Sequence, residues 1–379
     1  MKHFRKVMLV ITVMAMVLLG LNTPGFAAKV IKIGYTAPFT GSAAEFGVNG
    51  WRGIQLALEE INKKGVIVGG KKYTIEIKRY DSICTPTDGV ANVRKLAMQD
   101  RVVAILGDHC SSVCVAIGPL CDQFKIPGIT IECAADKVTK PGHEFYFRMR
   151  PSVGLMAPLI TPTIVEKFKP KSAAFLVVND DYGLGLASAI ATELDKFGVK
   201  TVVDETFERG NTDFTVYLAK IKKAKADILF YIGVTPEGAM ILKQAKEFGV
   251  TERTVLIGSE EMGEMELVSL AGPEAAEGTY AVSLWGAVPA DFAERVEDRF
   301  DAPMHYAIIF GYDALHVVAR AIESAQSLDP VKIKDAMKKI DYEALEGRIK
   351  FENFEGYRNQ CRFVPSLIQW KDGERVPLK

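Results

Sequence analysis

Short apolar runs and amphipathic stretches alternate along the first part of the chain. Hydrophobic residues three or four positions apart, such as Ile54, Leu58 and Ile61, predict helices, whereas continuous or alternating apolar runs predict strands. This series predicts strands at residues 30–35, 73–80, 102–106 and 127–131 and helices at residues 49–63, 86–98 and 112–124. The run at 102–106 is apolar throughout, which is typical of a strand buried on both faces of a parallel sheet.

A second series of similar length and order begins near residue 173. It predicts strands at residues 173–178, 200–207, 227–232 and 254–257 and helices at residues 182–197, 213–223 and 236–248. Strands that alternate with helices of about a dozen residues indicate parallel sheets with right-handed crossovers. The predicted fold class is therefore α/β, with two doubly wound parallel-sheet lobes.

The alternation stops after residue 277. The remaining chain predicts a strand at 280–284, a helix-rich block at about 290–340, closing strands at 348–351 and 362–370, and a turn between these two at 356–359. No low-complexity stretch or long Pro/Ser linker separates the two series, so short ordered segments must join the lobes. This arrangement favours a hinge over two tethered modules.

The N-terminal segment has the features of an export signal. Three basic residues precede an apolar run at residues 7–21, and the small residues Gly25 and Ala27 fit the pocket of a signal peptidase. Cleavage is therefore predicted after Ala27, which places the mature chain in the periplasm. The alternative is an uncleaved membrane anchor, but a span needs about 20 apolar residues, and Asn22 and Pro24 interrupt this run.

Charge and cysteine content limit the function further. Loss of Lys2, Arg5 and Lys6 with the signal would leave 44 of the 47 basic residues against 47 acidic ones. A nearly neutral chain without a basic stretch argues against a nucleic-acid partner. All six cysteines lie beyond the signal, and an even number in an exported chain permits disulfides, although six cysteines allow fifteen pairings.

Motifs for catalysis, cofactors or metals are weak. No His-Glu-x-x-His, Gly-x-Ser-x-Gly or phosphate-loop pattern is present in the sequence. Gly183 and Gly185 open a predicted helix about 20 residues before Asp204, but Ser188 stands where a dinucleotide fingerprint has its third glycine. The alternative is an ordinary helix start capped by an aspartate at 180 or 181.

A cysteine-rich segment could also be considered as a metal site. His109, Cys110, Cys114 and Cys121 provide soft ligands, but they lack the short paired spacing of zinc sites, and two of them lie within a predicted helix. Cys114 and Cys121 would be about 10.5 Å apart along that helix, too far for a disulfide. We therefore expect no metal and no cofactor.

The segment 107–112 carries the strongest site signal. It follows a buried strand and precedes a helix, at the sheet edge where open α/β folds bind ligands. The N–H groups of a helix start, together with the hydroxyls of Ser111 and Ser112, could hold a carboxylate; the alternative is that both serines only cap the helix. In the second series, residues 258–261 occupy the equivalent place, and their acidic side chains could bind an ammonium group.

Several motifs together resemble a known family. They are residues 33–41, Phe46-Gly47, Asn49-Gly50, Gly53, residues 60–65, Tyr80-Asp81 with Cys84, residues 107–112, residues 179–183, Gly210 with Asp213-Phe214, and residues 275–278. In order and spacing they are similar to the periplasmic leucine/isoleucine/valine-binding proteins, the type I substrate-binding components of branched-chain amino-acid ABC importers. The resemblance covers essentially the whole mature chain.

The resemblance implies two lobes joined by a three-segment hinge, as in type I periplasmic binding proteins. Its implied boundaries are a signal peptide at 1–27, a first lobe at 28–150 plus 285–357, and a second lobe at 151–284 plus 358–379. Residues of both lobes would then face one cleft.

The resemblance also implies roles for individual residues. Ser111, followed by Ser112, corresponds to the serine that binds the ligand carboxylate, with His109 and Cys110 beside it. Glu260 corresponds to the acid that pairs with the ligand ammonium, and Tyr182 to an aromatic side chain that closes over the ligand. Phe46 stands where the family often has Tyr, and the cleft is flanked by a disulfide that corresponds to Cys84–Cys110.

Other positions depart from the family pattern. An ungapped match puts Glu132 at a backbone-carbonyl contact and Ala134 where a threonine usually binds the ligand, whereas a shifted match would put Asp136 there. Val234 or Thr235 replaces an aromatic residue. Trp285, at the second hinge crossing, could add an apolar wall. These departures place leucine-type specificity in question.

Together these observations predict a non-enzymatic, monomeric receptor. It would capture an amino acid or a related small molecule and deliver it to an ABC permease in the membrane. The alternatives are a sensory receptor of the same fold, a receptor for an amide, urea-like or aromatic acid ligand, and an exported enzyme, for which no nucleophile–base pair was found.

Overall fold

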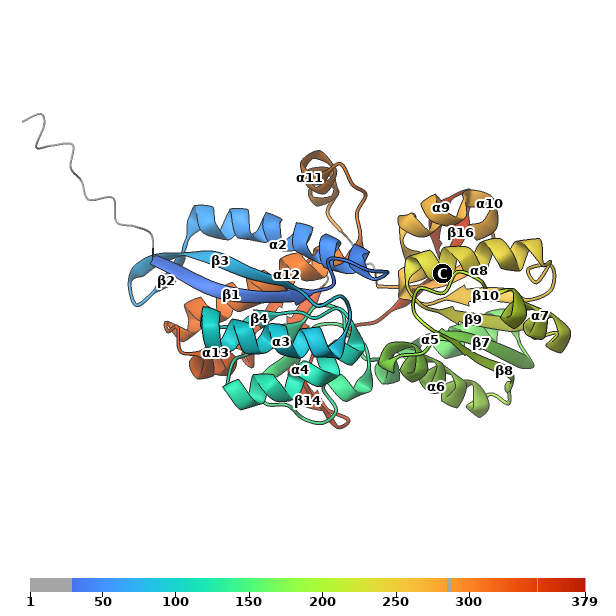
Figure 1. Cartoon of the computed structure of the whole chain (residues 1–379), viewed down its shortest axis with the longest axis horizontal. Coiled ribbons are helices and arrows are strands. Elements are labelled where there is room, and N and C mark those ends of the chain that lie inside the picture. The colour runs from blue at the N-terminus through green and yellow to red at the C-terminus, as the bar shows by residue number, and fades with distance from the viewer. Residues whose placement is uncertain (1–28, 285–287, 346, 379) are drawn as a thin grey trace, which may run out of the picture.

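The computed structural model describes residues 29–284, 288–345 and 347–378. Two lobes lie side by side along the long axis of the molecule, each built on one sheet with helices on both faces (Figure 1). The two βα series therefore form the two doubly wound lobes that the sequence predicts. In the part of the chain that is described, no helix is long and apolar enough to cross a membrane.

The first lobe contains an eight-stranded sheet in the order β14-β15-β6-β5-β4-β1-β3-β2. Its strands are β1 (Lys29–Ala37), β2 (Val66–Val68), β3 (Lys71–Asp81), β4 (Ile105–Leu106), β5 (Gly128–Thr130), β6 (Tyr146–Arg148), β14 (Glu352–Phe354) and β15 (Tyr357–Gln360). Its helices are α2 (Ala44–Lys64), α3 (Pro86–Lys95), α4 (Ser111–Phe124), α11 (Ala290–Phe300), α12 (Tyr306–Ala325) and α13 (Pro330–Met337). A small hairpin of β12 (Asp341–Glu343) and β13 (Arg348–Lys350) follows α13.

The second lobe contains a seven-stranded sheet in the order β17-β16-β11-β10-β9-β7-β8. Its strands are β7 (Ser172–Val178), β8 (Lys200–Phe207), β9 (Ile228–Ile232), β10 (Val255–Gly258), β11 (Tyr280–Ser283), β16 (Ser366–Lys371) and β17 (Glu374–Pro377). Its helices are α5 (Val153–Phe168), α6 (Asp181–Lys196), α7 (Thr215–Ala224), α8 (Thr235–Glu247), α9 (Met265–Ala271) and α10 (Pro273–Ala276). Strand β7 is buried from Ala173 to Val178, as its apolar run predicts.

Both sheets are parallel in the middle and antiparallel at their edges. Strand β2 pairs antiparallel with β3, and β16 pairs antiparallel with both β11 and β17. The predicted turn at 356–359 is only partly correct. Gly356 lies in the turn with a φ of 83°, but the following residues form β15, because they pair antiparallel with β14.

The chain passes between the lobes three times: between β6 and α5, between β11 and α11, and between β15 and β16. Gln360 of β15 is still paired with Arg148 in the first sheet. We therefore propose to place the third crossing after Gln360, three residues beyond the boundary that the resemblance implies.

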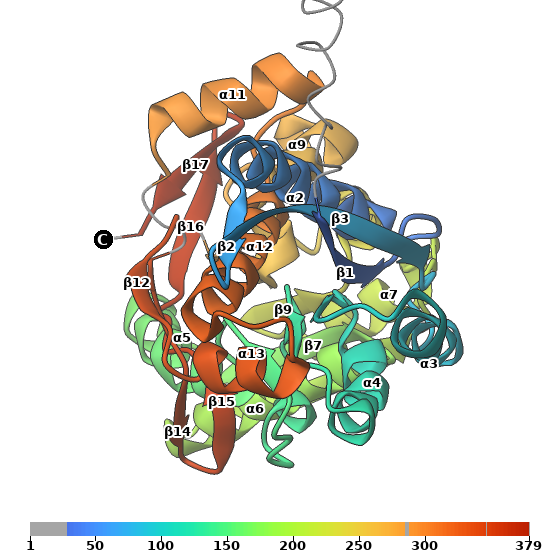
Figure 2. The same cartoon turned by 90° about the vertical axis from the view of Figure 1, so that its left-hand side faces the viewer.

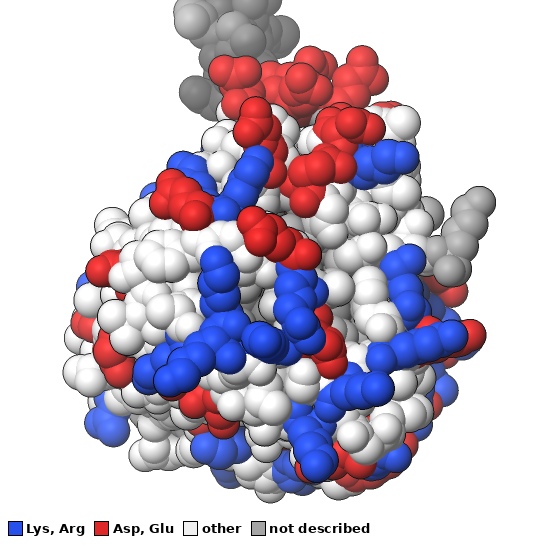
Figure 3. Space-filling view, turned by 90° about the vertical axis from the view of Figure 1, so that its right-hand side faces the viewer, with Lys and Arg blue, Asp and Glu red and all other residues white. Residues whose placement is uncertain are grey.

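Helix α11 lies at the outer edge of the first lobe (Figures 1 and 2). Phe292 and Val296 on its inner side form a buried cluster with Leu56 of α2 and Ile308 of α12. At the end of the second lobe, Lys and Arg side chains form a band with acidic side chains above it (Figure 3). This surface therefore carries charges of both signs.

Helices α2 and α12 approach each other closely in the first lobe. A Cβ atom added to Gly53 would lie 1.9 Å from the carbonyl oxygen of Ile308, and one added to Gly311 would lie 2.2 Å from the oxygen of Gly50. Because these are backbone contacts between two packed helices, neither position can hold a side chain without separating the helices.

We expect Gly53→Ala to lower the free energy of unfolding by about 1–3 kcal/mol, the usual cost of overpacking. Thermal or urea unfolding followed by circular dichroism would measure it. Gly185→Ala is the matched control, because its new Cβ would meet only Val153 at an ordinary 3.5 Å. A Gly53→Ala protein as stable as Gly185→Ala would contradict the close approach.

Candidate functional site

A cavity lies between the lobes, where the carboxyl ends of strands from both sheets meet. Ligand sites of open α/β folds form at this edge. The first lobe contributes Ala43, Phe46, His109, Cys110, Ser111, Glu132 and Arg150, and the second contributes Asp180, Tyr182, Arg209, Val234 and Glu261. Nearly all of these residues stand in loops or helix starts that follow a strand.

Ser111 is the first residue of helix α4 and is almost fully buried. Its Oγ accepts hydrogen bonds from the N–H groups of Ala134 and Ala135, both at 3.1 Å. These two bonds occupy the lone pairs of the oxygen and leave its O–H free to donate. The hydroxyl is therefore oriented as a donor at the positive end of a helix dipole, which suits a carboxylate.

Asp108, rather than a serine, satisfies the N–H groups just before α4. Its Oδ1 accepts hydrogen bonds from His109 N at 2.7 Å and Cys110 N at 3.0 Å. Burial raises the pKa of the Asp108 carboxyl. Neither Ser111 nor Ser112 caps α4 through its side chain, since Cys110 is the N-cap residue and makes no side-chain bond. The alternative that the serines only cap the helix is therefore wrong.

Ser112 faces the other lobe rather than the cavity. Its Oγ accepts a hydrogen bond from Asp181 N at 3.3 Å, at the start of α6 in the second lobe. Two further bonds join the lobes nearby: Lys137 to Asp181 at 2.9 Å, and Thr235 N to Glu45 Oε1 at 3.3 Å. The lobes are thus in contact beside the cavity.

The two acids after β10 lie in different surroundings. Glu260 is ion-paired with Arg150, and both side chains are almost completely buried. Glu261 lines the cavity and accepts a hydrogen bond from Tyr182 OH at 2.7 Å. Burial, and next the charge of Glu260, raise the pKa of Glu261 to about 8. At neutral pH the carboxyl of Glu261 is therefore mostly protonated when no cation is beside it.

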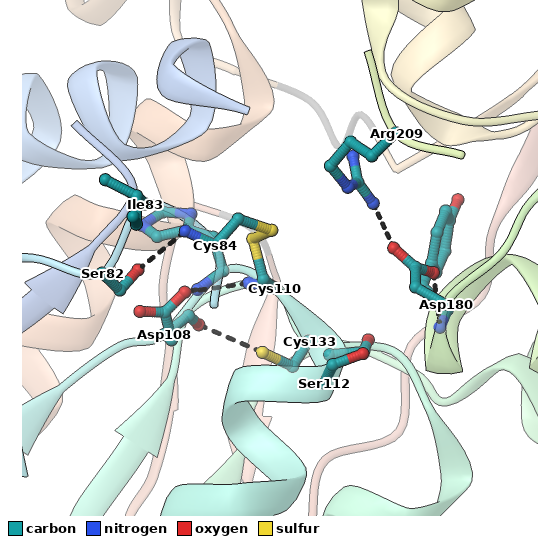
Figure 4. Close-up of a disulfide and its surroundings, with 12 residues drawn as sticks. Ser82, Ile83, Cys84, Asp108, Cys110, Ser112, Cys133, Asp180 and Arg209 are labelled. Atoms are coloured by element: carbon teal, nitrogen blue, oxygen red, sulfur yellow. Dashed lines mark hydrogen bonds and ion pairs between the residues drawn. A yellow bond between two sulfur atoms is a disulfide. The ribbon is translucent and has the colours of Figure 1, made fainter. Parts of the chain in front are cut away.

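Asp180 and Arg209 form the opposite wall. Asp180 caps α6 by accepting hydrogen bonds from Tyr182 N at 3.0 Å and Gly183 N at 2.9 Å, which confirms the ordinary helix start expected there. The same carboxylate is paired with Arg209, and Figure 4 shows this pair facing the Cys84–Cys110 disulfide across the cleft.

The predicted residues fall into three groups. Those that line the cavity are Phe46, His109, Cys110, Ser111, Glu132, Tyr182 and Val234. Those that do not line it are Ser112, which bonds Asp181; Ala134, whose N–H supports Ser111; and Glu260, which is paired with Arg150. Trp285 lies outside the described residues.

Sequence reasoning missed Ala43, Arg150, Asp180 as a wall residue and Arg209, and it included Glu261 only within the acidic segment 258–261. Most of them follow a strand directly, so the rule that located Ser111 could have located them too. The two arginines were overlooked because arginine side chains usually extend into solvent.

Two disulfides hold the first-lobe side of the cavity. The structure contains the Cys84–Cys110 bond that the resemblance implies, with Cα atoms 5.5 Å apart. A second bond, Cys114–Cys133, joins α4 to the loop after β5, with Cα atoms 6.3 Å apart. Because that loop carries Glu132 and the N–H groups that bind Ser111, the second disulfide stabilises the binding wall itself. In the described part of the chain, no group of His, Cys, Asp and Glu side chains is arranged to hold a metal ion.

We expect the Cys114→Ser, Cys133→Ser double variant to lose about 3 kcal/mol of stability, the entropic estimate for a loop of this size; the two cysteines are 19 residues apart. Urea unfolding of oxidised wild type and variant measures the difference. Alkylation of the denatured, unreduced wild-type protein provides the control. If either Cys114 or Cys133 is alkylated there, the second disulfide does not form.

Comparison with known proteins identifies the family. A family model described as "Periplasmic binding protein" matches residues 30–373. The leucine-, isoleucine-, valine-, threonine-, and alanine-binding protein of Pseudomonas aeruginosa is 30% identical over 378 residues, which cover 96% of each chain.

Solved structures agree with this result. The branched-chain amino acid transporter substrate-binding protein LivJ of Streptococcus pneumoniae, in complex with isoleucine, has a TM-score of 0.82 at 25% identity and covers 93% of this chain and 100% of its own. A solute-binding protein of an ABC transporter from Rhodopseudomonas palustris, in complex with 3,4-dihydroxybenzoic acid, has the same fold, with a TM-score of 0.81 at 22% identity over 92% and 96% of the two chains. The chain belongs to the periplasmic binding protein family and has its two-lobed type I fold.

Proposed function

We propose that this protein is the periplasmic receptor of an ABC importer and that it captures an α-amino acid in the cleft between its lobes. The observation that carries the proposal is the hydroxyl of Ser111, which is held as a free donor at the start of α4 and faces an acidic wall of the second lobe. A hydroxyl donor on one lobe and acidic side chains on the other suit a zwitterion, because its carboxylate can bind the donor and its ammonium group the acids. Amino-acid binding by the relatives named above supports the same ligand class.

In this proposal the ligand carboxylate lies at Ser111 and the N-terminus of α4. The ammonium group lies near the acids after β10, where Glu261 lines the cavity and Glu260 is held behind it by Arg150. Tyr182 and Phe46 enclose the ligand from the second and first lobes, respectively. Contacts to both lobes would favour the closed arrangement over an open one.

The cellular setting is part of the same proposal. The signal peptide is removed after Ala27, the monomeric receptor diffuses in the periplasm, and its closed form docks on a membrane permease. Aromatic acids are a second candidate ligand class, because a structural neighbour was solved with 3,4-dihydroxybenzoic acid. An aromatic acid would use the carboxylate position but not the acidic wall.

We expect Ser111→Ala to weaken amino-acid binding about 10- to 100-fold, because a hydrogen bond to a charged group contributes about 1.5–3 kcal/mol. Isothermal titration with leucine, threonine, alanine and 3,4-dihydroxybenzoate would measure the affinities of wild type and variant. Ser269→Ala, an exposed serine on α9, is the matched control. Unchanged affinity in a folded Ser111→Ala protein would contradict the carboxylate position, and binding of the aromatic acid alone would contradict the ligand class.

The raised pKa of Glu261 predicts a pH-dependent affinity. A ligand ammonium favours the ionised carboxyl, so binding releases a proton, and affinity should rise between pH 6 and pH 8 by up to about tenfold per pH unit. The charges around Glu261 are those of Glu260, Arg150 and Arg209, with the Tyr182 hydroxyl beside them. In the ligand-free protein the raised pKa of Glu261 affects stability in the opposite direction to affinity. The stability contributed by the neutral carboxyl is lost as the pH rises through about 8.

Titrations at pH 6, 7 and 8, in buffers of different ionisation enthalpy, would detect the released proton. We expect Glu261→Gln to abolish the pH slope, whereas the exposed Glu252→Gln on the second lobe should retain it. An equal slope in both variants would assign the titration to another group.

A further inference from the structure

One carboxylate on the first-lobe wall lies beside a row of buried side chains. Glu132 is 4% exposed, and its Oε2 lies 3.2 Å from Nδ1 of His109. The Nε2 of His109 lies 2.7 Å from the hydroxyl of Tyr35, which is itself fully buried in β1. His109 thus lies between Tyr35 and the carboxylate, and its Nδ1 is near Glu132 without forming a hydrogen bond to any described residue.

The other oxygen of this carboxylate has no partner. Among the described residues, none forms a hydrogen bond with Glu132 Oε1, although that atom is buried. A buried acceptor without a donor costs free energy, and most buried polar groups are satisfied. Because Glu132 lines the cavity, the missing donor fits a group that enters the cavity.

The main chain of Glu132 is already engaged. Its carbonyl oxygen accepts a hydrogen bond from Arg150 Nη1 at 2.9 Å. The resemblance implied that this position would contact a ligand through its carbonyl, but in this chain the carbonyl is bonded to Arg150 while the side chain faces the cavity. A carboxylate at this position is therefore a feature that can distinguish ligands.

The rest of the lining combines apolar and polar surface. Ala43, Phe46 and Val234 are its aliphatic and aromatic hydrocarbon side chains, and most of the other lining residues are polar or charged. The two arginines of the wall already have carboxylate partners, Glu260 for Arg150 and Asp180 for Arg209. With Glu261 assigned to the ammonium group, Glu132 is the acceptor that remains for the side chain of the ligand.

We propose that Glu132 is a specificity-determining residue, which accepts a hydrogen bond from a hydroxyl or carboxamide on the side chain of the ligand. The receptor then prefers α-amino acids with a polar, donor-bearing side chain over leucine, isoleucine and valine of similar size. An aliphatic side chain in this cavity leaves Oε1 buried and unpaired, which penalises the apolar ligand. This inference rests on the proposed amino-acid function and narrows its ligand.

Two ligand pairs of nearly equal shape test the inference: threonine against valine, and asparagine against leucine. Isothermal titration of the wild-type protein with all four is expected to show at least tenfold tighter binding of the polar member of each pair. In Glu132→Met, which has similar length and no acceptor oxygen, the preference should vanish or reverse. Glu132→Gln retains an acceptor oxygen and should keep part of the preference for the polar ligand. Glu252→Met, on the outer surface of the second lobe, is the control and should leave both ratios unchanged.

The ratio of the two affinities within each ligand pair is the decisive readout, because a change in protein stability alone would weaken the binding of both ligands equally. Wild-type protein that binds valine and leucine as tightly as threonine and asparagine would overturn the role of Glu132 and leave the amino-acid function standing. Wild-type protein that binds none of the four would overturn the proposed function as well. If Glu132→Met does not fold, Glu132→Gln decides: a polar preference that is reduced in Glu132→Gln supports the role of Glu132, and one that equals the wild-type preference contradicts it.

Discussion

The buried ion pair between Arg150 and Glu260 connects the hinge to both walls of the cleft. Arg150 lies in the first crossing between the lobes, donates to the carbonyl of Glu132 in the first lobe, and pairs with Glu260 in the second. Removing one partner of a buried pair leaves an uncompensated charge, which usually costs about 3–5 kcal/mol. Formation of the cavity in this arrangement therefore requires both side chains, and the positions of Glu132 and Glu261 depend on them.

The pairing also divides the charges of the cleft into two kinds. Arg150 with Glu260, and Arg209 with Asp180, neutralise one another and act as rigid parts of the wall. The side-chain carboxyl groups of Glu132 and Glu261 have only neutral hydroxyls or a histidine ring as ion-pair or hydrogen-bond partners in the described chain. A cleft built in this way presents acceptors on both lobes and a donor at Ser111, which is the polarity expected for a small zwitterion with a polar end.

Much of the fold could be predicted from the sequence, because strands buried on both faces leave a continuous apolar run and the helices between them keep a regular period. The strands at the edges of the two sheets were harder to predict. Strands β14, β15 and β17 have three or four residues each, and β15, although mostly buried, is defined by its pairing with β14 and β6 rather than by its own composition.

Individual site residues were less predictable than the site itself. Ser111 and Ser112 are consecutive in a helix, so their side chains point about 100° apart, and only the first reaches the cavity. Glu260 and Glu261 differ in the same way within a 3₁₀ turn, whose three residues per turn separate neighbours by about 120°. Such one-residue differences are set by helix phase and by tertiary partners such as Arg150, neither of which a local pattern contains.

The order of the strands also constrains how the chain acquires its structure. The first sheet takes β14 and β15, and the second takes β16 and β17, from the segment after residue 351. Contacts between segments so distant in sequence form slowly, and neither lobe can complete its sheet while this segment is still being synthesised or threaded through a membrane. For the exported chain proposed above, the same topology that produces the hinge keeps both sheets incomplete until the last segment of the chain is available.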